Sequence, residues 1–77
     1  MNNIRRKSLT KMMEEIENLR SDLESLRDEE QEYMDNMPEG LQGSSKYEVA
    51  ENAVSSLESA MDELESAMNS IQEAIDG

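Results

Sequence analysis

The stretch DNMPEGLQGS, residues 35–44, separates two long segments of periodic apolar residues and decides the fold. Pro38 disfavours helical geometry at Met37, the residue before it. We therefore expect a first helix over about residues 3–36. The connection that remains, about residues 37–44, is short, and two helices joined by a short connection usually lie antiparallel.

The composition of this connection also favours a chain reversal. Gly40 and Gly43 can adopt the positive φ angles that many reversals use. Leu41 is the one apolar residue between them, and we expect it to cover the open end of the hairpin. The segment Ser45-Lys46-Tyr47-Glu48 has the spacing of a capping box, and it predicts a second helix over about residues 45–76.

Apolar residues recur at alternating spacings of three and four in both segments, as in the seam of a coiled coil. In the first segment only Glu30 interrupts the stripe. The sequence therefore predicts an all-α fold, an antiparallel, coiled-coil-like helical hairpin over residues 1–77. The seam residues expected in the first helix are Leu9, Met12, Ile16, Leu19, Leu23, Leu26 and Tyr33. Those expected in the second helix are Tyr47, Val54, Leu57, Met61, Leu64, Met68, Ile71 and Ile75, with Ala50 in the same stripe.

The charged residues that flank the stripe agree with an antiparallel arrangement. Arg20 and Arg27 are the only basic residues in the middle of the first helix, and antiparallel packing turns them toward Glu51, Glu58 and Glu65. A parallel homodimer could pair the same arginines with acids of an identical helix, but it would leave the turn unexplained. Each exposed pair contributes only about 0.2–1 kcal/mol, so these charges select an orientation more than they stabilise it.

Two hairpin registers fit the stripe. The preferred register places residue pairs opposite one another so that the two chain ends lie flush: Leu23 with Leu57, Ile16 with Leu64, Leu9 with Ile71, and Glu30 with Ala50. The other register is shifted by one heptad.

A chain of 77 residues has difficulty burying enough apolar surface by itself. Without Cys or His, neither a disulfide nor a structural zinc site is expected to compensate. Oligomerisation is the remaining route, and a column of small residues at heptad spacing would let another helix approach closely: Ala53, Ala60, Ala67 and Ala74. We expect this column to contact a second copy in a four-helix bundle, or a partner protein in its place. Alanine also has the highest helix propensity, so the column is compatible with an indifferent surface as well. Met13 and Met34 lie outside the predicted seam and are further candidates for intermolecular contact.

The net charge is -12, and it is unevenly distributed. The first eleven residues hold four bases and no acid, whereas all nineteen acids follow them. Most of the surface should therefore repel nucleic acid and anionic membranes, and no direct contact with either is expected. The basic cluster of Arg5, Arg6, Lys7 and Lys11 could pair with Glu73, Asp76 and the terminal carboxylate, or it could dock on a phosphate-bearing partner. No apolar run is long enough for a membrane span or a signal peptide, so we expect a cytoplasmic protein.

Clusters of carboxylates, such as Glu14-Glu15 and Asp28-Glu29-Glu30, raise the question of metal or acid–base chemistry. Di-iron sites in helical bundles use Glu-x-x-His pairs, and this chain has no His. No calcium-loop spacing is present either. We expect no catalytic residue, no metal ligand and no cofactor, and we expect the protein not to be an enzyme.

The chain resembles small, uncharacterised helical-hairpin proteins of Gram-positive bacteria and their prophages or mobile elements. The residues that carry the resemblance are Asn3-Ile4-Arg5-Arg6-Lys7, residues 35–44, Tyr47-Glu48 and the heptads rich in Ala and acids near the C-terminus. A looser likeness is to the WXG100 and LXG-associated secretion proteins, since Leu41-Gln42-Gly43 stands where those hairpins carry their turn motif. The first resemblance implies a fold and a source, and the second implies a secretion-system partner.

The sequence as a whole predicts a non-catalytic structural or interaction protein that self-associates through helix packing. Two alternatives stay open at this point. One is an acidic decoy or adaptor that binds a basic, nucleic-acid-binding protein. The other is a small helical partner of a WXG100 or LXG type of secretion system.

Overall fold

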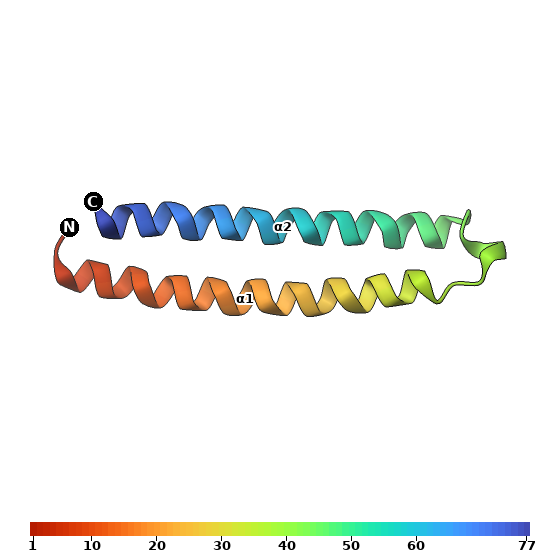
Figure 1. The fold of residues 1–77 in the computed structure, drawn as a ribbon, viewed down its shortest axis with the longest axis horizontal. Coiled ribbons are helices and arrows are strands. Elements are labelled where there is room, and N and C mark those ends of the chain that lie inside the picture. The colour runs from red at the N-terminus through yellow and green to blue at the C-terminus, as the bar shows by residue number, and fades with distance from the viewer.

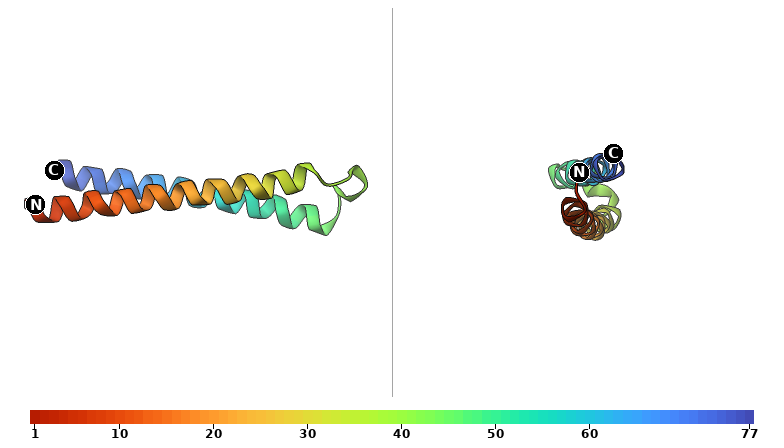
Figure 2. Two further views of the ribbon diagram at one scale, coloured as in Figure 1. Left: turned by 90° about the horizontal axis from the view of Figure 1, so that it is seen from below. Right: turned by 90° about the vertical axis from the view of Figure 1, so that its left-hand side faces the viewer.

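The computed structural model describes all residues, 1–77, and consists of two long helices joined by a short turn. Helix α1 spans Asn3–Asp35, a single 3₁₀ turn spans Glu39–Leu41, and α2 spans Ser45–Asp76. The helices run antiparallel and side by side, with both chain ends at one end of the molecule (Figure 1). They cross at a shallow angle (Figure 2), and the molecule measures 59 × 15 × 12 Å. The predicted all-α antiparallel hairpin is confirmed.

Polar side chains begin both helices. Asn2 caps α1, since its side-chain oxygen accepts a hydrogen bond from the N–H of Arg5 at 2.8 Å. Ser44 caps α2 in the same way and accepts from the N–H of Tyr47 at 3.4 Å. The expected capping box starting at Ser45 is therefore not formed. The cap lies one residue earlier, and the third helical position then holds Tyr47, which cannot return the bond as a Glu would.

The turn reverses the chain without any positive φ angle. Successive tight turns make the reversal: Leu41 donates its N–H to the carbonyl of Pro38, and Gln42 donates to the carbonyl of Glu39. The expectation that Gly40 and Gly43 supply positive φ is thus corrected. Leu41 is half-exposed, so it does not cover the open end of the hairpin as expected.

Only five of the 77 residues are buried, and four of them lie toward the turn. Ala50 is the most deeply buried residue, at 1% exposure, and Met34 and Val54 pack with it, while Tyr47 covers this cluster from one side. The remaining buried residues are Met37 and Met61. Farther from the turn the helices meet through half-buried side chains, because two helices alone can enclose only one narrow seam.

The two helices contribute differently to this seam. On α2 the contact stripe is as expected, since Ala50, Val54 and Met61 are buried and the others are half-buried, namely Tyr47, Leu57, Leu64, Met68, Ile71 and Ile75. On α1 only three of the expected residues are half-buried: Leu9, Ile16 and Leu23.

Four residues expected in the α1 seam lie outside it. Met12, Leu19, Leu26 and Tyr33 expose 50%, 56%, 53% and 50% of their surface. Met13, Arg20, Arg27 and Met34, each the next residue along the chain, face α2 instead and are buried or half-buried. At 3.6 residues per turn, this corresponds to a rotation of α1 by about 50° from the expected orientation, because one column of the stripe moves by one residue and the other stays. The rotation brings the two arginines within reach of acids on α2, and it places Met34 against Ala50.

In the core near the turn, the pairing of the helices differs from both expected registers. Met34 packs against Ala50, which was expected to lie opposite Glu30 or, after a shift of one heptad, opposite Met37. At the other end Arg6 reaches the carbonyl of Ile75, which the flush register placed one residue away, opposite Arg5, so the chain ends lie as that register predicted. The core pairing therefore falls between the two registers, because α1 meets α2 through a different pair of columns.

The turn geometry predicts the effect of alanine at both glycines. Because neither glycine has positive φ and a Cβ atom at either would meet nothing within 4 Å, alanine should fit without strain. Gly40→Ala and Gly43→Ala should each raise the free energy of unfolding by about 0.4–1 kcal/mol, through a less flexible unfolded chain. Urea denaturation followed by circular dichroism measures the change. A clear loss of stability in either variant would mean that the turn requires a glycine-only conformation.

Candidate interaction surface

Three columns of side chains run along the side of α1 that faces or borders α2: a central column of seam residues, a column with the two arginines, and a column with the leucines that precede them. Leu19 and Arg20 are adjacent in sequence, as are Leu26 and Arg27, so the members of each pair point about 100° apart around the helix. Both arginines reach acids on one flank of the hairpin. The leucines must therefore lie on the opposite flank, with the seam between the two.

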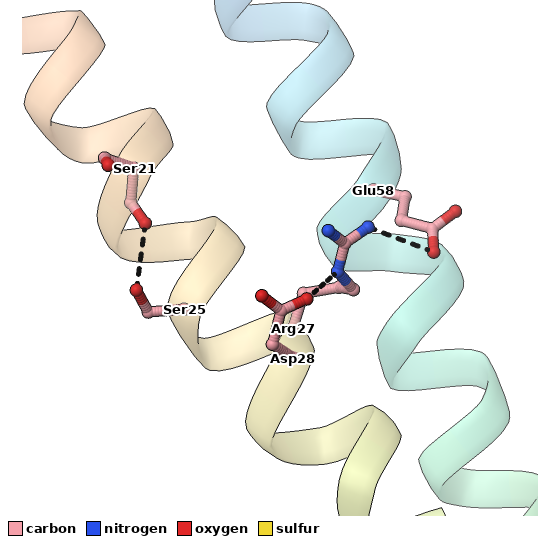
Figure 3. Close-up of polar contacts among 5 residues, drawn as sticks. All are labelled: Ser21, Ser25, Arg27, Asp28 and Glu58. Carbon is pink, nitrogen blue, oxygen red and sulfur yellow. Dashed lines mark hydrogen bonds and ion pairs between the residues drawn. The ribbon is translucent and has the colours of Figure 1, made fainter.

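The arginine flank is closed by ion pairs between the helices. Arg27 Nη1 lies 3.5 Å from Glu58 Oε1, and Arg20 Nη2 lies 3.7 Å from Glu65 Oε2. These contacts agree with the expectation that the arginines face this row of acids, although Glu51 takes part in no ion pair. Arg27 also donates from Nε to Asp28 Oδ1 at 2.8 Å, so its guanidinium lies between a carboxylate of each helix (Figure 3). That hydrogen bond and the nearby Glu58 hold the pKa of Arg27 above its ordinary value.

Arg20 is less well satisfied than Arg27. Its Nε atom is buried without a hydrogen-bond partner, and its only ionic contact is the pair with Glu65. A buried donor without a partner costs about 1–3 kcal/mol, which exceeds the roughly 0.2–1 kcal/mol of an exposed ion pair. Arg20 is therefore the less favourable of the two arginines for the stability of the hairpin.

The opposite flank carries an uncovered apolar column on α1. Met12, Leu19, Leu26 and Tyr33 recur every seven residues, so they form one stripe that follows the seam along the length of α1. Each of them is at least half-exposed. We call this stripe the α1 apolar column.

The alanine column of α2 lies on the same flank. The groove that ends the flank near the turn is lined by Glu30, Tyr33, Ser45, Lys46, Val49 and Ala50. Tyr33 belongs to the α1 apolar column, and Lys46 lies one heptad before Ala53, in line with the alanine column. The groove therefore borders both columns. Ala53 and Ala60 are half-buried at the edge of the seam, whereas Ala67 and Ala74 are exposed. We call the α1 apolar column and the alanine column together the apolar flank.

Two residues expected on a partner surface are not available for that role. Met34 is 5% exposed and belongs to the core near the turn. Met13 is half-buried in the seam. Met13 and Met34 therefore lie in the seam, where the α1 apolar column was expected, and that column lies outside it. The signal for this exchange is a second stripe at alternating spacings of three and four, which runs through Leu9, Met13, Ile16, Arg20, Leu23, Arg27, Glu30, Met34 and Met37.

The basic N-terminal cluster lies beside the end of α2. Arg6 donates from Nε to the carbonyl of Ile75 at 3.2 Å and from Nη1 to Asn3 Oδ1 at 3.3 Å. A cation that bonds a carbonyl in the last turn of a helix is also favoured by the helix dipole. The expected ion pairs with Glu73 and Asp76 are absent, since Arg6 bonds to the backbone and the other bases of the cluster point into solvent.

The remaining surface shows open grooves and scattered charges. No group of three or more acidic, His or Cys side chains is arranged to hold a metal ion. Neither helix has a stretch that is both long and apolar enough to cross a membrane. No family model, curated protein or solved structure matches this chain.

Replacing Arg20 by methionine should make the hairpin more stable. Arg20→Met removes the unsatisfied Nε atom and adds apolar surface to the seam, so the free energy of unfolding should rise by about 1 kcal/mol or more. Arg27→Met is the matched control, and its effect should be smaller because Arg27 loses two ionic contacts and no unsatisfied donor. Denaturant titration of both variants gives the comparison. Equal or reversed effects would show that Arg20 is not the weak point of the seam.

Proposed function

We propose that this chain is a non-catalytic interaction protein that works by helix packing, and that its apolar flank packs against a second copy to form a four-helix bundle. The observation that carries the proposal is the α1 apolar column, which is half-exposed along its length and lies beside a column of alanines. Large apolar side chains gathered on one face of a small soluble domain commonly mark an interaction surface.

The small core supports the same conclusion. A hairpin with five buried residues has little apolar burial to set against the conformational entropy of 77 ordered residues. Covering the apolar flank would bury four more large side chains per copy. Folding and association are then one process, as in other small domains that gain their core from a partner.

The chain also supplies a suitable counterpart for its own flank. A two-fold dimer brings the same surface of both copies together, so that surface must be self-complementary. The apolar flank combines large side chains on α1 with small ones on α2, both at a period of seven residues. Matching periods let the side chains of two hairpins interdigitate in layers, and the alanines let helices approach closely.

Charge placed on the apolar flank should abolish self-association. Wild type should sediment as a dimer or higher oligomer, whereas Leu19→Glu/Leu26→Glu and Ala60→Glu/Ala67→Glu should each sediment as monomers with much less helix. The physical reason is that an ionised carboxylate cannot be buried between helices without a partner. Sedimentation equilibrium and circular dichroism on the same samples provide the measurements.

The matched controls add the same two charges to the outer face of each helix. Asn18→Glu/Ser25→Glu and Ser59→Glu/Ser66→Glu alter exposed residues that lie away from the seam and the flank. These variants should keep the assembly of the wild type. Association that survives glutamates on the apolar flank, or that is lost equally in the controls, would rule out this surface.

A second candidate is binding to a basic protein, as a decoy for nucleic acid. The observation that favours it is the acidic surface itself, since only Asp28, Glu58 and Glu65 of the nineteen acids take part in ion pairs. The remaining carboxylates leave a strongly negative surface over most of the hairpin, which would attract a positively charged partner.

Salt distinguishes the two candidates. Two copies of a chain with net charge -12 repel one another, so added salt should screen the repulsion and strengthen self-association. Binding to a basic partner should weaken as salt rises. Sedimentation equilibrium between low and moderate sodium chloride concentration measures the first effect. Self-association that weakens steadily with salt would contradict packing through an apolar flank.

A further inference from the structure

Charge is separated along the long axis of the hairpin. The tip, where both chain ends lie, carries four bases on α1, namely Arg5, Arg6, Lys7 and Lys11, beside two acids on α2, Glu73 and Asp76. The turn end carries eight acids and one base, Lys46, over residues 28–51. The two regions lie at opposite ends of a molecule 59 Å long (Figure 1). Each hairpin is therefore polarised, with a basic tip and a strongly acidic turn end.

Two symmetric arrangements can bring the apolar flanks of two hairpins together. In one, the two-fold axis runs along the helices, both turns lie at the same end, and like-charged ends meet. In the other, the axis is perpendicular to the helices, and the turn of each copy lies beside the tip of the other. Charge favours the perpendicular axis, because it sets the basic tip of one copy beside the acidic turn end of the other and keeps the two acidic turn ends apart.

The apolar flank fits the perpendicular axis as well. Leu19 of one copy then lies opposite Leu26 of the other, and the same axis relates Met12 to Tyr33. On α2 the corresponding pair is Ala60 with Ala67, so helix α2 meets its counterpart through small residues and can approach it closely.

The same position of the two-fold axis has to satisfy the pairing of residues on both helices. The midpoint between Leu19 and Leu26 on α1 has to lie level with the midpoint between Ala60 and Ala67 on α2. The ion pairs Arg20–Glu65 and Arg27–Glu58 bracket this level on both helices. The register of the hairpin therefore aligns the centres of the two columns.

We infer that two copies pack through their apolar flanks in antiparallel orientation, with the basic tip of each copy against the acidic turn end of the other. This inference rests on the self-association proposed above and adds its geometry. Arg5, Lys7 and Lys11 are exposed at the tip. None of these three bases forms an ion pair within the hairpin, and the dimer places the acidic turn end of the other copy beside them.

Distances between labels at the turns test the orientation. The chain has no cysteine, so Leu41→Cys introduces a single site for a spin label on an exposed residue of the turn. Pulsed electron paramagnetic resonance on the labelled dimer should give a separation close to the 59 Å length of the hairpin. Turns at the same end would instead give less than about 30 Å, since neighbouring helices in a bundle lie about 8–10 Å apart.

A mixed dimer provides the complementary measurement. Chains labelled at Ile4→Cys, an exposed site near the tip, are combined with chains labelled at Leu41→Cys. The antiparallel dimer should show efficient energy transfer between tip and turn, and a dimer with both turns at one end should show very little. Every label pair is intermolecular because each chain carries one cysteine.

The outcomes separate this inference from the proposed function. A sedimenting dimer with a short turn-to-turn distance and no tip-to-turn transfer would overturn the antiparallel arrangement and leave self-association intact. A chain that sediments as a monomer would overturn both. A long turn-to-turn distance together with efficient tip-to-turn transfer is the result that the inference requires.

Discussion

The constraint on which this structure depends is the small amount of apolar surface that two helices can bury against each other. Each helix meets the other along one narrow stripe, and only five residues become buried. The core is concentrated near the turn, where Met34, Ala50 and Val54 pack together. Toward the chain ends the seam consists of half-buried side chains, so little apolar burial stabilises the contact between the helices there.

The rotation of α1 determines which apolar side chains stay uncovered. Arg20 and Arg27 occupy positions beside the seam and form the ion pairs between the helices. Their sequence neighbours Leu19 and Leu26 are consequently displaced to the other flank, beside the alanines of α2. One flank of the hairpin is thus closed by charge and the other is left apolar. This asymmetry is the basis of the proposed self-association.

The sequence was sufficient for the fold and for the contact stripe of α2, because Pro38 marks the break and α2 offers one clear apolar stripe. Helix α1 offers two overlapping stripes that share Leu9, Ile16 and Leu23. Choosing between them requires knowing that Met34 fits over Ala50, a steric match that spacing alone does not reveal. The pairing of the helices near the turn was missed for the same reason. The glycines of the turn were misread because consecutive tight turns can reverse a chain with negative φ throughout.

We propose that this hairpin obtains its stability from association through the apolar flank. The most direct test of this proposal is thermal unfolding, followed by circular dichroism, over about a hundredfold range of chain concentration. If folding is coupled to association, the midpoint temperature rises with concentration. A sharp transition at high temperature with a midpoint independent of concentration, in a chain that sediments as a monomer, would contradict the account.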